Sequence, residues 1–286
     1  MKYELNADKK GATAITKKYH QELLKKMDDV YLESERQDLA QLKKHLILEL
    51  GKEDILDYDG TVLFDHTQYQ STHAKGSPET VNPYLWQTIK DNEIAGVVQL
   101  SDNYYLVTGV DVSMIGFIKT HNGWIVQDCG NYVESAKIAL RLAEKAVNED
   151  IKSNIKAIII SHSHVDHYAG IEAFLGEEKI PVIAPVNYEQ SLIDDNLYAG
   201  VAMSRRLQYQ GGFLVGHGEQ GSVGCGLNSV AVMGKKLSFI MPDVLIEHDQ
   251  TITIDGINVD FILSPNTETR AHMCTYYHED EVLFLG

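Results

Sequence analysis

Apolar and polar residues repeat with two different periods along the chain, and the period changes after about residue 80. Residues 12–50 place apolar side chains three and four positions apart, as in ATAITKKYHQELLKKM and QDLAQLKKHLILEL. This spacing predicts helices with one apolar face. Later runs such as VVQLSDNYYLVTG (97–109) and SMIGFIKTHNGWIVQDCG (113–130) alternate or stay apolar between Gly, Asn and Asp. This second pattern of hydrophobicity predicts short strands.

A helix directly before a fully apolar strand indicates the fold class. The segment YVESAKIALRLAEKAVNED (132–150) places Ile138, Leu142 and Val147 on one helical face. It is followed by IKAIIIS (155–161), which is typical of a strand buried on both sides. A helix that leads into a buried strand indicates an α/β fold. Together with the strands before it, this pattern predicts sheets sandwiched between helices.

Turn signals place further elements and a domain boundary. DYDGTVLFDHTQYQ (57–70) predicts a short hairpin, residues 196–210 a mixed helix, and TITIDGINVDFIL (251–263) two strands around an Asp-Gly turn. We therefore expect a helical N-terminal extension with a hairpin over residues 1–80. The main domain is expected over residues 81–286.

The charge balance limits the partners of the protein. Its 286 residues include 25 Lys and Arg against 41 Asp and Glu, a formal net charge of −16. This balance argues against a nucleic-acid-binding protein, which needs a concentrated basic face, and against attraction to an anionic membrane. No apolar run approaches the ~20 residues of a membrane span. An anionic substrate would therefore need a local site of positive charge.

The cysteines and the N-terminus bear on the compartment. Cys129, Cys225 and Cys274 are scattered and odd in number, so they do not form a disulfide framework. The first residues include no apolar segment typical of a secretion signal. We expect a cytoplasmic protein, and a periplasmic or secreted one if a signal has been removed.

The stretch SHSHVDHYAG (161–170) carries the clearest chemistry. It places His162, His164, Asp166 and His167 within six residues, directly after the predicted buried strand. Imidazole and carboxylate donors suit zinc and similar ions. A loop leaving a strand directs such side chains differently, so two residues can bind one ion while two reach a second. Two divalent ions would activate a bridging water and bind an anionic oxygen. A solvated polar loop is the alternative.

The HxHxDH motif after a buried strand resembles the metallo-β-lactamase superfamily, whose fold is an αββα sandwich. Further segments, VNPYLWQ (81–87), TGVDVSMIGFI (108–118) and NLYAGVAMSRRLQYQGG (196–212), are similar to its alkylsulfatase branch. The resemblance runs from about residue 10 to the last residue. It implies a fold of this type and hydrolysis of linear alkyl sulfates such as dodecyl sulfate.

The resemblance also implies a set of metal ligands. His162, His164 and Glu268 would bind a first zinc ion, with Asp166 and His167 on the second. Asp166 is also expected to be catalytic. Without the resemblance, Glu268 would be interpreted as a solvated turn residue.

Residues around the expected ligands match the branch only in part. Asp128 ends the strand GWIVQD, where the branch also has an aspartate, and we expect it to hydrogen-bond a ligand histidine. The chain has Thr269 and Arg270 where the branch has Ala-Pro. His272 stands where the branch has a second glutamate, and it is either a replacement partner or a surface residue.

The SRR segment of the branch offers candidates for substrate binding. Arg205 and Arg206 would pair with sulfate oxygens through their planar donors, or else form internal ion pairs. Tyr209 would donate a hydrogen bond to sulfate, or else be a core aromatic at helical spacing.

The resemblance implies two further metal ligands and two further regions that are not among the 286 residues of this sequence. They are a metal-bridging glutamate directly after Gly286, a later zinc-binding histidine, a helical dimerisation region and a sterol-carrier-like domain. We therefore expect a C-terminally truncated form with little activity, and a homodimer for the full-length form.

The leading hypothesis is zinc-dependent hydrolysis of alkyl sulfate esters to alcohol and inorganic sulfate, with two zinc ions in a complete site. One alternative is a hydrolase of the same fold that acts on another ester, a phosphodiester or a thioester. The other is a catalytically incomplete fragment that binds metal.

Overall fold

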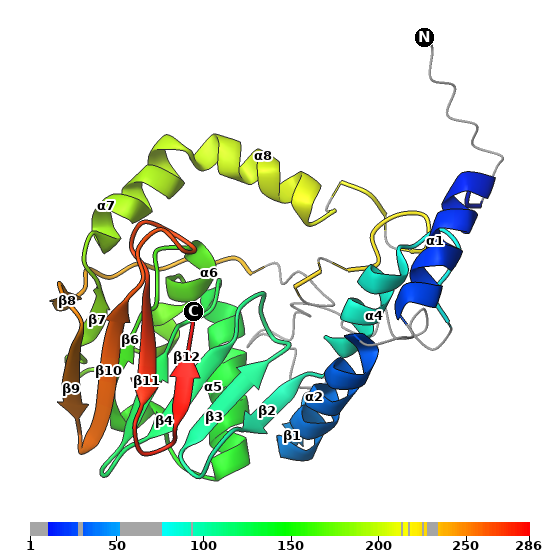
Figure 1. The fold of residues 1–286 in the computed structure, drawn as a ribbon. Coiled ribbons are helices and arrows are strands. Elements are labelled where there is room, and N and C mark those ends of the chain that lie inside the picture. Colours follow the sequence, from blue (N-terminus) through cyan, green and yellow to red (C-terminus); the bar gives the residue numbers. More distant parts are fainter. Residues whose placement is uncertain are drawn as a thin grey trace.

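Two β-sheets packed face to face form the centre of the protein (Figure 1). The computed structural model describes residues 11–27, 31–51, 76–92, 94–212, 214–216, 218–224, 226–227 and 234–286. One sheet has eight strands and the other has four. The predicted mixed fold of sheets and helices is therefore confirmed, and a helical N-terminal extension is present.

The eight-stranded sheet combines an antiparallel and a parallel part. Its first five strands are antiparallel, and its last four, counted from β5, are parallel. In spatial order the strands are β1 (Leu46–Glu49), β2 (Gly96–Gln99), β3 (Tyr104–Thr108), β4 (Ile115–Lys119), β5 (Trp124–Gln127), β6 (Ile155–Ile159), β7 (Val182–Pro185) and β8 (Val244–Ile246).

The four-stranded sheet is antiparallel throughout and contains β9 (Gln250–Ile254), β10 (Ile257–Leu263), β11 (Met273–Tyr277) and β12 (Val282–Phe284). Asp255 and Gly256 join β9 to β10 with φ angles of 43° and 87°. Two positive φ angles are typical of the tight hairpin turn that the Asp-Gly pair predicts. The sheets share a core that includes Tyr104, Ile118, Ile125, Ile159, Val259, Phe261, Met273 and Tyr277.

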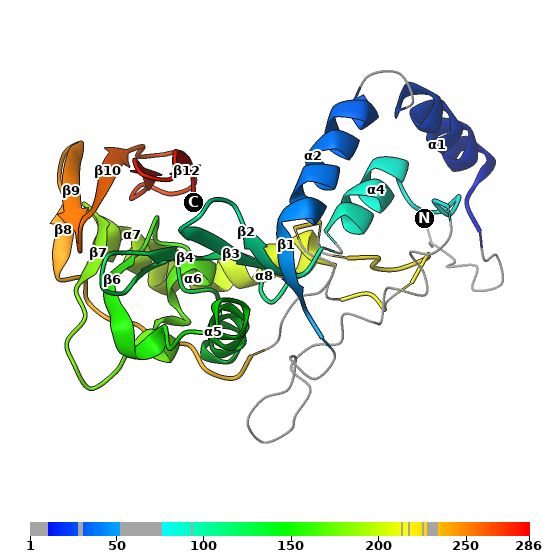
Figure 2. The ribbon, with the colours of Figure 1, turned by 90° about the horizontal axis from the view of Figure 1, so that it is seen from below.

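The helix α5 (Val133–Val147) covers the outer face of the eight-stranded sheet (Figure 2). Ile138 and Leu142 are each 1% exposed, which confirms the predicted apolar face. Asn148 ends the helix in the left-handed region, at a φ of 55°. α5 also connects β5 to β6, and a crossover helix is the usual connection between parallel strands.

The N-terminal helices α1 (Ala14–Met27), α2 (Tyr31–His45) and α4 (Pro83–Asp91) lie beside the β1 edge of the large sheet (Figures 1 and 2). The helical prediction for residues 12–50 is wrong at Leu46–Glu49, which pairs with β2. Pairing with a distant strand overrides the local helical spacing there. β1 thus joins the main sheet from within the proposed extension, and the boundary at residue 80 stays a prediction. The hairpin predicted at 57–70 lies outside the described residues.

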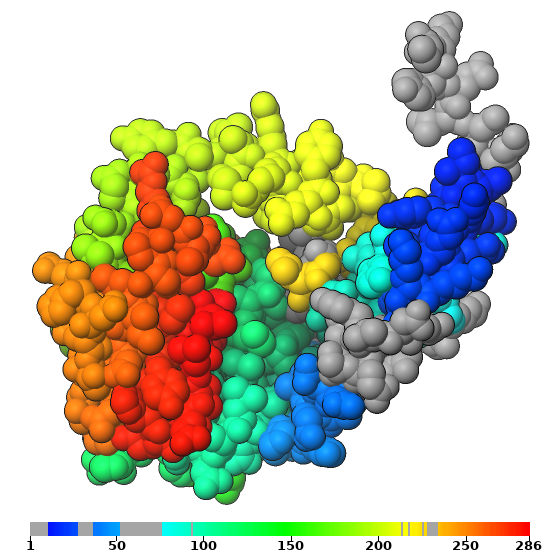
Figure 3. Space-filling view, in the orientation of Figure 1, coloured from blue at the N-terminus to red at the C-terminus, as the bar shows by residue number. Residues whose placement is uncertain are grey.

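The remaining helices lie at the carboxyl ends of the parallel strands or connect them. They are η2 (Lys152–Asn154), α6 (Val165–Tyr168), η3 (Ile171–Phe174), α7 (Tyr188–Ile193), the π-helical η4 (Asp194–Tyr198) and α8 (Gly200–Gln210). In Figure 3 α8 stands away from the sheets, with an open hollow beneath it. No side chain of α8 is buried. Among the described helices, none has the length and hydrophobicity that a membrane crossing requires.

Candidate metal centre

The HxHxDH motif lies where β6 ends and α6 begins. Ser161, His162 and Ser163 are each 1% exposed or less. His164 occupies the position before the first turn of α6, so the chain changes direction between the two histidines. Since β5 and β6 are parallel, Asp128 after β5 emerges at the same edge of the sheet. In α/β folds this carboxyl edge is the usual place for a functional site.

Three side chains of the predicted first metal group come together at this edge. One ligand atom each of His162, His164 and Glu268 lie within 4.8 Å of one another. The Nε2 of His162 is 3.1 Å from the Nδ1 of His164, and Glu268 reaches them from the loop between β10 and β11. Two imidazoles and a carboxylate are a donor set that zinc uses when it also binds water. The donor chemistry therefore fits a zinc ion.

The predicted second pair lies beside the first group. The Nε2 of His167 is 3.4 Å from a carboxylate oxygen of Asp166, and the rings of His167 and His162 have centroids 4.0 Å apart. Burial lowers the pKa of His167, but the charges and hydrogen bonds of Asp128 and Asp166 outweigh burial and raise it to about 10. Two carboxylates that stabilise an imidazolium cation here would also stabilise a bound metal cation.

Their surroundings leave His162 neutral and Asp166 ionised. Burial, together with the nearby His167, His164 and His272, lowers the pKa of His162 to about 2, which leaves its imidazole neutral. Burial raises the pKa of Asp166, but the hydrogen bond and charge of His167 lower it to about 2. Metal ligation requires a neutral imidazole and an ionised carboxylate. His162 and Asp166 meet these conditions at neutral pH, whereas His167, whose pKa is raised to about 10, would have to release a proton to bind a metal.

Asp128 supports the motif from beneath. Its buried carboxylate accepts hydrogen bonds from the Ser161 backbone N–H at 2.7 Å, the Ser161 hydroxyl at 2.8 Å and the Nδ1 of His167 at 2.6 Å. The residue has a φ of 60°, which directs the chain away from β5. The structure thus places Asp128 against the expected histidine. The contact fixes the proton of His167 on Nδ1 and directs Nε2 toward Asp166.

The sequence reasoning did not identify Asp111, which supports the loop after β5. Its buried carboxylate accepts hydrogen bonds from the backbone N–H groups of Val112 and Asn131, at 2.7 and 2.9 Å, and from the Ser135 hydroxyl. Burial outweighs these bonds and raises the pKa of Asp111 to about 6. The Ser113 hydroxyl donates to the Asp166 carbonyl. Asp111 and Ser113 belong to the TGVDVSMIGFI segment, but nothing in the sequence of that segment indicates which distant residues they contact.

His272 is also part of this site. It is 4% exposed, forms an isolated β-bridge with His162, and its ring centroid is 5.0 Å from that of His162. Burial lowers its pKa, although the Leu285 backbone, Asp128 and Glu268 act in the opposite direction. The interpretation of His272 as a surface residue is therefore wrong. In the same loop Arg270 forms an ion pair with Asp194 at 3.0 Å, which ties the Glu268 loop to η4.

The candidate substrate-binding residues lie on α8, away from this buried support. Arg205, Arg206 and Tyr209 are all exposed, and Tyr209 is 79% exposed. The alternative of a core aromatic is therefore wrong for Tyr209. Across the described part of the chain, neither arginine forms an ion pair or hydrogen bond, so nothing there joins them to the histidine cluster.

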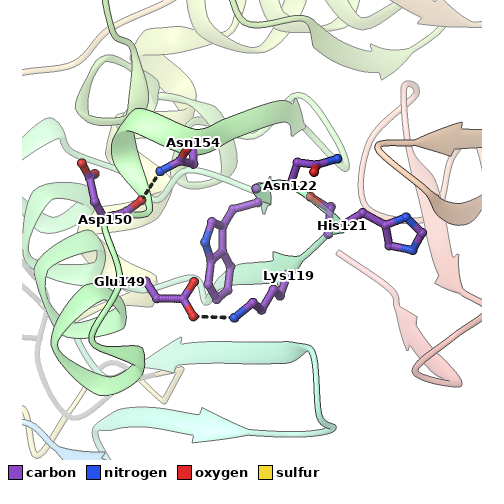
Figure 4. A pocket seen from close by; sticks show the side chains of 9 residues that line it. Lys119, His121, Asn122, Glu149, Asp150 and Asn154 are labelled. Carbon is purple, nitrogen blue, oxygen red and sulfur yellow. Dashed lines mark hydrogen bonds and ion pairs between the residues drawn. The ribbon is translucent and has the colours of Figure 1, made fainter.

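A polar cavity of about 350 Å³ lies at the opposite edge of the large sheet (Figure 4). It is formed by the β4–β5 turn and the end of α5, near the start of β6. Lys119 lies 5.7 Å from the centre of the Trp124 ring and forms an ion pair with Glu149. No candidate residue from the sequence lines this cavity, whose lining is Lys119, Thr120, His121, Asn122, Gly123, Trp124, Glu149, Asp150 and Asn154.

Comparison with known proteins agrees with the geometry. Residues 108–286 match the metallo-beta-lactamase superfamily. The chain is 32% identical over 259 residues to the alkyl/aryl-sulfatase BDS1 of Saccharomyces cerevisiae, covering 88% of this chain and 40% of that protein. It is 32% identical over 282 residues to an (R)-specific secondary-alkylsulfatase of Pseudomonas sp, covering 96% and 41%.

A solved structure extends this similarity to the fold. The stereoselective inverting sec-alkylsulfatase Pisa1 from Pseudomonas sp. matches with a TM-score of 0.85 and 30% identity, over 95% of this chain and 43% of that one. The chain spans about two fifths of the length of the curated relatives it matches. The resemblance to alkylsulfatases is thereby confirmed for most of the chain.

Proposed function

Because the chain belongs to the metallo-beta-lactamase superfamily, we propose that it acts in the zinc-dependent hydrolysis of alkyl sulfate esters to alcohol and inorganic sulfate. The observation that carries the proposal is the convergence of His162, His164 and Glu268 in a chain similar to named alkylsulfatases. Two of these residues come from the motif and the third from a loop of the other sheet. The fold therefore assembles a donor set from distant parts of the sequence.

Each metal position has its own residues. His162, His164 and Glu268 would hold one zinc ion, and Asp166 with His167 would contribute to a second. When bound, zinc supplies Lewis acidity that activates water and stabilises negative charge on the sulfate oxygens. Two ions would also bring four positive charges to a chain of net charge −16, so an anionic substrate would be attracted locally.

The residues around the donors fix their orientation. Asp128 accepts the Nδ1 proton of His167 and leaves Nε2 directed toward Asp166. The Ser161 hydroxyl lies 2.9 Å from the Nδ1 of His162, which leaves Nε2 of that ring toward His164. Because these supports are buried, the donors need little rearrangement to bind. Asp166, ionised beside His167, is the proposed catalytic carboxylate.

Recognition of the sulfate group is proposed for α8. Arg205 and Arg206 present planar donor groups that match sulfate oxygens, and Tyr209 presents a hydroxyl donor. Their exposure supports this proposal, because among the described residues no carboxylate forms an ion pair with either arginine. Apolar side chains of α8 and of η4 before it, such as Val201 and Leu197, at 73% and 74% exposed, would contact the alkyl tail.

Two wider features belong to the same proposal. The full-length form is proposed to be a homodimer, on the basis of the alkylsulfatase resemblance. A cytoplasmic location is proposed because Cys129 and Cys274 are free thiols in the structure.

The test is sulfate release from dodecyl sulfate by the zinc-loaded protein, in the full length that its gene encodes. Replacing His164 with Ala should abolish release, since it removes a donor of the first metal group. The control is His248→Ala, an exposed histidine, which should retain the unsubstituted rate. Hydrolysis of a phosphodiester or thioester without sulfate release would overturn the proposal in favour of another ester.

A further inference from the structure

The short helix α6 carries both residues of the proposed second metal position, Asp166 and His167, and it is only four residues long. The last carbonyl groups of a helix have no partner within the helix. In α6, the carbonyls of the two candidate ligands therefore need hydrogen-bond donors from elsewhere in the chain. These donors determine how the turn is oriented.

Two different loops supply the donors. The Ser113 hydroxyl, from the loop between β3 and β4, donates to the Asp166 carbonyl. The Cys129 N–H, from the loop after β5, donates to the His167 carbonyl at 2.8 Å. The backbone of each candidate ligand is thus held from outside α6.

Asp111 joins these two loops and holds Ser113 in place. Its carboxylate accepts hydrogen bonds from the Val112 N–H in the first loop, at 2.7 Å, and from the Asn131 N–H in the second, at 2.9 Å. The Ser135 hydroxyl, in α5, donates to the same carboxylate. Asp111 is 1% exposed and Ser113 is 7% exposed. A buried, cross-linked loop therefore presents the Ser113 hydroxyl to α6.

This support leaves the ligand atoms of α6 accessible. The side chains of Asp166 and His167 are 29% and 12% exposed. Ser113 bonds the backbone carbonyl of Asp166, so it occupies neither carboxylate oxygen. The first metal group is held by other contacts, since the Ser161 hydroxyl lies 2.9 Å from the Nδ1 of His162 and Glu268 comes from the β10–β11 loop. Ser113 thus acts on the second position.

We propose that Ser113 is a positioning residue for the second metal position. By binding the Asp166 carbonyl, its hydroxyl sets the rotation of the α6 turn, and with it the directions of the Asp166 carboxylate and of the His167 ring. Metal ligands must be held within about 0.5 Å of their productive geometry, so a small rotation of the turn weakens binding. The inference rests on the proposed function, because it concerns the second of its two metal ions.

The test measures metal affinity and does not depend on activity. The protein, in the full length that its gene encodes, is stripped of metal and titrated with Zn²⁺ against a chromophoric chelator, which gives two dissociation constants. His167→Ala identifies the constant that belongs to the second position. Ser113→Ala should raise that constant by about 10–100-fold, as loss of a partner that orients a metal ligand does, and leave the other unchanged.

Two further variants separate positioning from a general loss of stability. Ser113→Thr keeps the hydroxyl and should restore the second dissociation constant. Ser238→Ala is the matched control, because its hydroxyl also donates to a backbone carbonyl beside α6, that of Ala169, at 2.8 Å. That carbonyl also accepts the Ser238 N–H at 2.8 Å, so it stays paired, and both constants should be unchanged.

Circular dichroism and urea denaturation establish that each variant is folded. Unchanged constants in folded Ser113→Ala, or equal weakening of both, would overturn the positioning role and leave the proposed function intact. Equal weakening of the second constant in the threonine and alanine variants would assign the effect to packing and also overturn the role of the hydroxyl. Absence of zinc binding in the unsubstituted protein would overturn the proposed function itself, and this inference with it.

Discussion

The loop after β6 and the segment that ends in α8 differ in how the rest of the chain holds them. In residues 161–168, buried hydrogen bonds that the Asp128 carboxylate accepts fix the backbone and the His167 ring. In residues 194–210, most side chains are exposed, and Arg270 provides an ion pair from outside at Asp194. Both segments belong to the resemblance with alkylsulfatases, yet only the first is rigidly built into the core.

This difference shows that the stabilising buried hydrogen bonds lie around the predicted metal donors and not around α8. Donor atoms for a metal must be held within a few tenths of an ångström, and buried hydrogen bonds do this. A surface that contacts a long apolar tail needs area more than fixed geometry. The exposed Leu197, Tyr198 and Val201 provide that area. The following substitutions test whether stability is concentrated in the first segment.

The largest effect is expected from Asp128→Ala. It would leave the Ser161 N–H and the His167 ring without their buried acceptor, and should lower the free energy of unfolding by about 3–5 kcal/mol. Asp128→Asn keeps one acceptor oxygen and tolerates the positive φ, so it should cost less. Urea denaturation measures both. A loss below about 1 kcal/mol for the alanine variant would contradict the buried-support account.

Packing around the same loop is tested by Gly170→Ala. The new Cβ would lie 2.1 Å from the Cys129 carbonyl oxygen and 2.7 Å from the Cβ of Ala136. Such overpacking should destabilise the protein by about 1–3 kcal/mol. Gly176→Ala is the matched control, because its Cβ would have no neighbour within 4 Å. Equal unfolding midpoints for the two variants would show that the loop is not tightly packed.

The pH dependence of stability tests whether hydrogen bonds to a carboxylate that is not deeply buried, Asp255, also stabilise the fold. Hydrogen bonds from Asn122 and Thr120 lower the pKa of Asp255 to about 2, from 3.8. Since the folded-state pKa is depressed, this stabilisation is present above pH 3.8 and is lost as the pH falls through about 2. After allowance for solvent screening it should be about 1 kcal/mol. Asp255→Asn should flatten the acid limb of the stability profile by that amount, and an unchanged limb would contradict the assignment.

The smallest effect is expected on α8. Tyr209→Ala should change the free energy of unfolding by no more than about 0.5 kcal/mol, because the side chain is 79% exposed. Ile159→Ala, in the buried strand before the motif, should cost about 2–5 kcal/mol in the same assay. A large loss for the tyrosine variant would remove the contrast between the two segments.

The sequence predicted the elements whose signal is local. Apolar spacing predicted α5, the fully apolar run predicted β6, and the Asp-Gly pair predicted the β9–β10 turn. It did not predict β1, because helical spacing at Leu46–Glu49 is overridden by pairing with a strand about fifty residues later.

For the site, the motif indicated which residues would gather but not how they are supported. The contacts of Asp111, and the pairing of His272 with His162, join segments far apart in the chain, and no spacing rule encodes them. The placement of Glu268 was expected only from the family resemblance. Its approach to the two histidines depends on packing between the sheets, which periodicity alone does not specify.

The most direct test of the central claim is anomalous diffraction at the zinc edge from crystals soaked in Zn²⁺. The account predicts a peak at about 2.0–2.2 Å from a nitrogen of His162, a nitrogen of His164 and a carboxylate oxygen of Glu268. A zinc peak confined to other residues, such as those of the cavity beside Trp124, or no peak at all, would contradict it.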